Sequence, residues 1–249
     1  MTQLYLRLVP IVLALMLGAG LLAGSASAAP TNATCDGGTI AAGRYTSLTI
    51  TGDCSLPDSG TVTVNGGLQL APDSSLNGAT PANLVVHGNV SVGSGAALVL
   101  GCDPEVGCEV TTEPQITGGL TANGALAVIV HNATIRGNVS IQGGGGGVSC
   151  DPLLMGGPAY MDLENSQISG GVSITGVNSC WMGFIRNSVS GTVNISGNTL
   201  ADPDAIEVVT NSIRGSLVCT GNDPIAKIGD SEGAPNNVTG SKVGECAPL

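Results

Sequence analysis

The sequence predicts an all-β protein, a right-handed parallel β-helix (solenoid) of about eight coils with disulfide-clipped ends. The main observation is a short phrase that occurs four times and begins with asparagine each time, at Asn132, Asn165, Asn187 and Asn211. The intervals between these asparagines are 33, 22 and 24 residues. A period of about 20 to 30 residues with one short strand motif in each period is typical of stacked coils.

Each copy of the phrase leads into a segment in which apolar and polar residues alternate, as in a strand with one buried face. These segments are Val139–Ile141, Val172–Ile174, Val193–Ile195 and Leu217–Cys219. Earlier segments with the same alternation lie at 48–50, 62–64, 85–92 and 116–118. Glycines mark successive repeats at steps of about 25 residues, at Gly66, Gly88, Gly118, Gly137, Gly170, Gly191 and Gly215. This step favours a three-sided right-handed coil over a smaller left-handed one.

The composition agrees with a solenoid. The chain has 39 glycines among 249 residues, and only 10% of its residues are charged. Stacked aliphatic residues can therefore fill the interior, while Gly, Asn and Asp occupy turns that need left-handed backbone. We expect one β-helix domain over residues 29–249, because about 220 residues suffice for a single long core.

The N-terminus has the pattern of a secretory signal peptide over residues 1–28. Arg7 precedes an apolar run from Leu8 to Leu22, and the small residues Ala26 to Ala28 form a cleavage site. The apolar run is short and no stop-transfer pattern follows it. We therefore expect a secreted protein, extracellular or associated with the cell wall, with no membrane anchor after cleavage.

All eight cysteines lie after this segment and none forms a CxxC pair. An even number of cysteines in an exported chain indicates disulfides. Pairing in the order of the chain is expected for a stacked fold, although eight cysteines allow 105 pairings. The expected pairs are Cys35–Cys54, Cys102–Cys108, Cys150–Cys180 and Cys219–Cys246.

The charge excludes some partners. The formal net charge is −11, which argues against nucleic acid because phosphates need Lys and Arg. It also disfavours anionic polysaccharides unless a cation bridges the two. The sequence predicts no cofactor and no metal, since the cysteine spacing is wrong for a zinc site and there are only two histidines.

The asparagine phrase resembles the coils of the pectate-lyase-like superfamily of right-handed β-helices. The resemblance implies that Asn132, Asn165, Asn187 and Asn211 lie at a tight turn and stack into an internal ladder of amides. The resemblance spans residues 45–240 and concerns the fold only. The Asn-Thr-Asp, Asp-Asp, Gly-His-Gly and Arg-Ile-Lys motifs of its enzymes are absent from the sequence, so no activity is carried over.

A charged and aromatic patch is predicted beside the ladder. If the four repeats are aligned on the asparagine, the residues one and three positions earlier face outward. The expected patch consists of His131, Tyr160, Asp162, Glu164, Trp181, Phe184 and Arg186. Aromatic rings with carboxylates and an arginine suit a sugar-binding platform. The alternative is a surface ion pair between Glu164 and Arg186 that binds nothing.

A second outward row is expected on the following strands. It contains the small uncharged residues Thr63, Ser91, Ser140, Ser173 and Asn194.

Three hypotheses for function follow. The leading one is a secreted, non-catalytic structural or glycan-binding protein whose partner is an extracellular polysaccharide. The second is a polysaccharide lyase or glycosidase that uses Asp162, Glu164 and Arg186 as acid, base and charge stabiliser. The third is a surface protein that self-associates through exposed edges of the solenoid.

Overall fold

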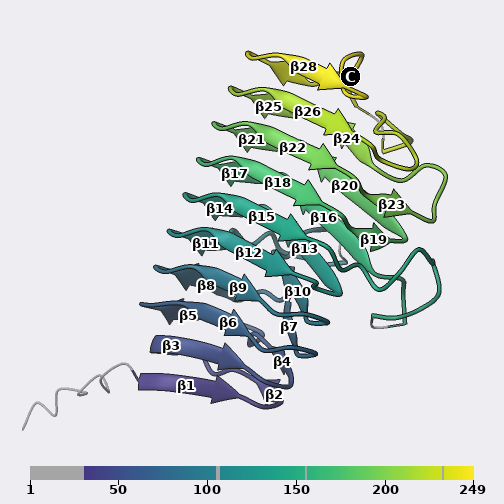
Figure 1. Cartoon of the computed structure of the whole chain (residues 1–249). Coiled ribbons are helices and arrows are strands. Elements are labelled where there is room, and N and C mark those ends of the chain that lie inside the picture. Colours follow the sequence, from purple (N-terminus) through teal and green to yellow (C-terminus); the bar gives the residue numbers. More distant parts are fainter. Residues whose placement is uncertain (1–30, 105–106, 155, 232) are drawn as a thin grey trace, which may run out of the picture.

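Figure 1 shows the computed structural model of the chain as rows of strands stacked along one direction. The structure describes residues 31–104, 107–154, 156–231 and 233–249. The predicted signal peptide, residues 1–28, lies outside the described residues. All regular elements in the described part are β-strands. No helix in this part is long and apolar enough to cross a membrane.

The strands form two extended sheets and one short pair. The large sheet has 18 strands: β1 (Thr31–Cys35), β3 (Gly43–Ile50), β5 (Thr61–Val64), β6 (Leu68–Leu70), β8 (Asn83–Val86), β9 (Val90–Val92), β11 (Gln115–Ile116), β12 (Leu120–Asn123), β14 (Thr134–Ile135), β15 (Val139–Gln142), β17 (Gln167–Ile168), β18 (Val172–Thr175), β21 (Ser188–Val189), β22 (Val193–Ser196), β25 (Ser212–Ile213), β26 (Leu217–Thr220), β27 (Asn237–Val238) and β28 (Lys242–Gly244).

The second sheet has eight strands, and the short pair lies apart from both sheets. The second sheet contains β2 (Gly38–Thr39), β4 (Asp53–Ser55), β7 (Ser75–Gly78), β10 (Ala97–Leu100), β13 (Ala127–His131), β16 (Tyr160–Glu164), β20 (Trp181–Ile185) and β24 (Glu207–Val209). The pair is β19 (Asn178–Ser179) with β23 (Thr199–Leu200).

Every pairing between these strands is parallel. The register of these pairings joins each strand to the equivalent strand of the next repeat. In the large sheet, Val139 pairs with Val172, and Val172 pairs with Val193. These side chains are buried and belong to one continuous hydrophobic cluster. Alternation along each strand sends β-branched residues into this core and polar residues to the other face.

A ladder of buried polar side chains connects the repeats at the turn before the large sheet. The Asn187 amide N–H donates to Asn211 Oδ1 at 2.8 Å, and the Asn211 N–H donates to Asn236 Oδ1 at 3.0 Å. The Asn211 side chain also donates to the Phe184 carbonyl at 2.7 Å. Ser166 occupies the preceding rung, where its N–H donates to Asn187 Oδ1. Each side-chain amide of the ladder thus forms hydrogen bonds with backbone N–H and C=O groups that have no partner in a sheet.

The predicted ladder is wrong for Asn132 and Asn165. Both residues have positive φ, at 56° and 52°, and lie one position before the ladder. The cause is a difference in phrase length, since the first two copies have one residue more between asparagine and glycine than the last two. Pairing of Gln167 with Ser188 places Ser166, not Asn165, in the same column as Asn187.

The four disulfides join the pairs expected from the order of the chain: Cys35–Cys54, Cys102–Cys108, Cys150–Cys180 and Cys219–Cys246. The first links β1 to β4, and the last links β26 to the C-terminal turn. Each can contribute roughly 2–4 kcal/mol to stability. Four disulfides suit an oxidising environment such as the outside of the cell.

The outward row of the large sheet differs in one member from the prediction. Thr63 pairs with Val85 and lies in another column, while Gln69 pairs with Ser91. We call the observed row the polar column. From one end of the sheet to the other it contains Thr34, Thr49, Gln69, Ser91, Thr121, Ser140, Ser173, Asn194, Val218 and Val243.

Replacement of Asn211 by alanine tests the ladder. We expect Asn211→Ala to lower the free energy of unfolding by about 2–4 kcal/mol, because it leaves the buried Asn187 N–H and the Phe184 carbonyl without these partners. Urea unfolding of the purified protein measures the loss. The matched control is Asn237→Ala on the exposed side of β27, which should change stability by less than about 0.5 kcal/mol. Equal effects of the two changes would contradict the ladder's role.

Candidate functional site

Three charged residues of the predicted patch, His131, Asp162 and Glu164, lie on neighbouring strands of the second sheet. His131 on β13 pairs with Glu164 on β16, and Ile129 pairs with Asp162. Asp162 and Glu164 are two positions apart on one strand, so their side chains point to the same face of the sheet. The register thus brings one histidine and two carboxylates together.

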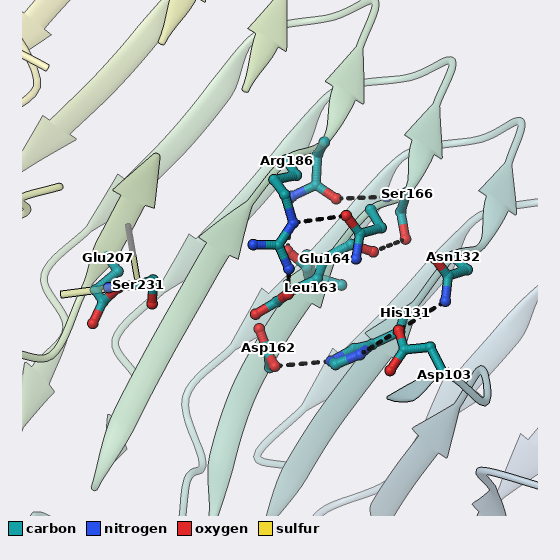
Figure 2. Close-up of polar contacts among 12 residues, drawn as sticks. Asp103, His131, Asn132, Asp162, Leu163, Glu164, Ser166, Arg186, Glu207 and Ser231 are labelled. Carbon is teal, nitrogen blue, oxygen red and sulfur yellow. Dashed lines mark hydrogen bonds and ion pairs between the residues drawn. The ribbon is translucent and has the colours of Figure 1, made fainter. Parts of the chain in front are cut away.

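His131 lies between two carboxylates. Its Nε2 is 2.9 Å from Asp162 Oδ2, and its Nδ1 is 3.3 Å from Asp103 Oδ2. Asp103 comes from the segment after β10 and also accepts a hydrogen bond from Asn132 Nδ2 at 2.8 Å. Figure 2 shows Asp162 and Asp103 on opposite edges of the imidazole ring. The exposed fractions of His131 and Asp162 are only 3% and 9%.

The pKa of His131 is raised to about 9 from its usual value of 6.5. Burial of the ring by itself favours the neutral form. The hydrogen bond to Asp162 and the negative charges of Asp162, Glu164 and Asp103 outweigh this effect. The ring is therefore an imidazolium at neutral pH and donates from both nitrogens.

Arg186 completes this group of charges. Its Nη2 donates to Glu164 Oε2, and its Nε donates to Asn165 Oδ1 at 2.8 Å. The Glu164 side chain is 8% exposed and the Arg186 side chain is 32% exposed. We call Asp103, His131, Asp162, Glu164 and Arg186 the buried charge network. Each of its three buried carboxylates contacts one of the two cations, as buried charges require.

Two predicted positions in the patch are wrong. Phe184 was expected to face outward, but it pairs with Leu163 and is fully buried in the core. Arg186 was expected in the same column as Glu164, but Glu164 pairs with Ile185. Arg186 instead has φ of 56° and occupies the turn position equivalent to Asn165. Both errors come from the same one-residue shift that misplaced the ladder.

Tyr160 and Trp181 lie side by side, as their places at the start of paired strands predict. They pair directly, and their rings meet edge to face with centroids 5.8 Å apart. The Trp181 ring lies over Gly183, where an added Cβ would clash with the ring and lie 2.7 Å from Asp162 Oδ1. Trp181 Nε1 donates to Glu207 Oε1 at 3.3 Å. Both rings keep part of their surface exposed.

Asp103 and Glu207 were not predicted to belong to this group. Glu207 pairs with Gly183, which pairs with Asp162, so alignment on the glycines would have placed Glu207 in the same column. Burial raises the pKa of Glu207, although hydrogen bonds from Ser231 and Trp181 oppose the change. Asp103 lies outside the repeats, in a segment closed by the Cys102–Cys108 disulfide, and no pattern in the sequence identifies it.

Among the residues that the structure describes, two groups of side chains have the donor atoms and proximity to hold a metal ion. The first is His131, Asp162 and Glu164, and the second is Asp204, Glu207 and Asp230. In the second group Lys227 Nζ lies 3.3 Å from Asp204 Oδ1, so an internal cation already balances part of the charge. The first group consists of three buried residues on paired strands.

Comparison with known proteins gives no relative. No protein-family model, no curated protein and no solved structure matches the chain. The chemistry of its own residues therefore carries the functional argument.

The raised pKa of His131 predicts that stability depends on pH. A raised pKa in the folded state means that the network stabilises the fold fully below about pH 6.5, and this contribution is lost as the pH rises through 9. We expect the free energy of unfolding to fall by roughly 2–4 kcal/mol between pH 6.5 and pH 10. Urea unfolding across this range measures the fall.

The matched variants for this experiment are His131→Gln and His87→Gln, since His87 is the other histidine and is exposed. The His131 variant should lose most of the pH dependence, and the His87 variant should keep it. Equal pH dependence in wild type and the His131 variant would contradict the network.

A methyl group at Gly183 should displace Trp181. We expect Gly183→Ala to move the emission of Trp181, the only tryptophan, to longer wavelength because the ring becomes more exposed. It should also cost about 1–3 kcal/mol of stability through overpacking. Fluorescence and urea unfolding measure the two effects. Unchanged emission would show that the ring does not lie over this glycine.

Proposed function

We propose that this chain is a secreted, non-catalytic protein that binds neutral extracellular polysaccharide through the exposed face of the large sheet. The observation that supports this proposal is the polar column, which contains no charged residue in a chain of net charge −11. A flat array of hydroxyl and amide groups can donate to and accept from sugar hydroxyls without desolvating any charge.

The neighbouring columns of the same sheet strengthen the proposal. One runs through Asn123, Gln142, Thr175, Ser196 and Thr220. The other begins at the exposed Arg44 and continues through Thr63, Val85, Gln115, Thr134, Gln167, Ser188, Ser212 and Asn237. Arg44, at one end of the sheet, is the one charged residue among these paired positions. Strands about 4.8 Å apart repeat the same groups at a constant step, which suits a ligand that is itself a regular polymer.

The architecture that we propose is a right-handed parallel β-helix of about eight coils, of the pectate-lyase-like kind. Parallel pairing between residues one repeat apart and the amide ladder of Asn187, Asn211 and Asn236 support it. Secretion rests on the signal-peptide pattern of residues 1–28, and the four disulfides fit an oxidising environment.

The enzyme hypothesis loses its main support. It requires Asp162 and Glu164 to meet a substrate, but Asp162 contacts His131 and Glu164 contacts Arg186 under the surface. Exposed acid and base groups are what a lyase or glycosidase needs within reach of the sugar. The partly exposed residues Tyr160 and Trp181 are the part of the predicted patch that can still contact a ligand.

Co-sedimentation with insoluble neutral polysaccharides tests the proposal. We expect the wild-type protein to pellet with at least one such polymer, and to do so equally at low and high salt because no charge is involved. The double variant Thr121→Glu/Ser173→Glu places two carboxylates on the polar column, and its pelleting should fall to the level of the blank.

The matched control is Val148→Glu/Asn178→Glu, which adds the same charge at exposed positions away from this face and should pellet like wild type. Trp181→Ala separates the sheet face from the aromatic pair. Loss of pelleting in Trp181→Ala with retention in Thr121→Glu/Ser173→Glu would move the site to Tyr160 and Trp181. Pelleting of protein without polymer would instead favour self-association.

A further inference from the structure

Three donor atoms converge at the centre of the buried charge network. One ring nitrogen of His131 and one oxygen each of Asp162 and Glu164 lie within 4.8 Å of one another. The three residues are 3%, 9% and 6% exposed. An imidazole with two carboxylates is a donor set that suits divalent first-row transition metals.

The backbone holds these donors in place. His131 and Glu164 are paired residues on adjacent parallel strands, and Asp162 is two residues before Glu164 on the same face. Donors on strands in the middle of a sheet have little freedom to move apart, which favours a defined coordination geometry. Figure 2 shows the Asp162 carboxylate and the edge of the His131 ring pointing toward each other from these two strands.

Asp103 is placed as the outer partner of the histidine. Its Oδ2 lies 3.3 Å from Nδ1, on the opposite edge of the ring from Asp162. A carboxylate in this position fixes the tautomer and orientation of a metal-binding histidine and makes Nε2 a better ligand. The Cys102–Cys108 disulfide closes the segment that carries Asp103.

The buried carboxylates of the network outnumber the positive groups that contact them. Three carboxylates, from Asp103, Asp162 and Glu164, are buried here with Arg186 and His131 as the positive groups that contact them. A Zn²⁺ ion that displaces the Nε2 proton of the imidazolium brings two positive charges and, together with Arg186, balances the three carboxylates. Buried carboxylates are stable when they are paired or coordinate a metal.

We propose that His131 Nε2, Asp162 and Glu164 bind one Zn²⁺ ion, and that Asp103 is a positioning residue for His131. Zn–ligand bonds of about 2.0–2.2 Å in a tetrahedral site put neighbouring donors roughly 3.4 Å apart. The observed Nε2 to Oδ2 distance of 2.9 Å requires only a small outward movement of the carboxylate. Ca²⁺ fits less well, since it prefers six to eight oxygen ligands.

The metal site and the polysaccharide surface are on different sheets, so each proposal can fail without the other. Isothermal titration of chelator-treated, purified protein with Zn²⁺ tests the metal site. We expect saturable binding of one ion per chain, and Ca²⁺ should give none. Absence of saturable Zn²⁺ binding by the wild-type protein would overturn the proposal.

Two histidine variants locate the ion. His131→Gln should weaken Zn²⁺ binding by at least about a hundredfold, because it removes the only nitrogen ligand. His87→Gln changes the exposed histidine and should bind like wild type. Unchanged binding in His131→Gln, or loss in His87→Gln with retention in His131→Gln, would contradict the assignment. Trp181 emission shows whether each variant is folded.

Replacement of Arg186 is expected to increase the affinity of the protein for Zn²⁺, a result that misfolding cannot produce. Arg186 competes with the ion for Glu164, so Arg186→Asn should tighten Zn²⁺ binding by about tenfold. Asparagine is suited to the positive φ of this position, where Asn132 and Asn165 occupy the equivalent sites. Asp103→Asn should weaken binding by about 10–100-fold through the orientation of His131. Weaker binding in Arg186→Asn protein that is folded by its Trp181 emission would contradict competition between Arg186 and the ion for Glu164.

Discussion

Parallel backbone hydrogen bonds between successive repeats decide which side chains become neighbours in this protein. A shift of one residue sends every side chain of a strand to the opposite face, so register is fixed wherever one face is buried. Val172 lies between Val139 and Val193, and the core is continuous because aliphatic residues recur at these positions. The ladder of Asn187, Asn211 and Asn236 satisfies the backbone at the turns, where the sheet cannot. The same pairing sets His131 beside Glu164.

The two extended sheets present different chemistry to their surroundings. In the second sheet, β13, β16 and β24 carry charged outward residues, and Asp103 and Arg186 contact His131 and Glu164, so that contacts between opposite charges replace contacts with water. The polar column of the large sheet carries hydroxyls, amides and two valines, with no charge to steer or repel a ligand. The two proposals, a neutral polymer on the large sheet and a metal ion on the second sheet, rest on this difference, and neither depends on the other.

The sequence predicted many strands of the large sheet, the parallel stacking and the pairing of all eight cysteines, because hydrophobic alternation and the order of the cysteines depend on local and neighbouring repeats. The predictions from the sequence were wrong where the position of a side chain depended on a one-residue difference in the length of the phrase. The phrases at Asn132 and Asn165 are one residue longer than those at Asn187 and Asn211, and alignment on asparagine shifted the later repeats. Alignment on the glycines would have placed Phe184 in the core and Arg186 at the turn. Asp103 could not have been predicted, since its position depends on a segment outside the repeats.

Charged outward residues of the second sheet surround His131 and hold its ring as an imidazolium. The most direct measurement is a ¹⁵N NMR titration of the histidine ring in chelator-treated His87→Gln protein, in which His131 is the one remaining histidine. We expect both ring nitrogens to stay protonated at neutral pH and the charge to be lost near pH 9. A ring that is already neutral at pH 7 would contradict this expectation. It would show that Asp103, Asp162 and Glu164 do not hold His131 in its charged form.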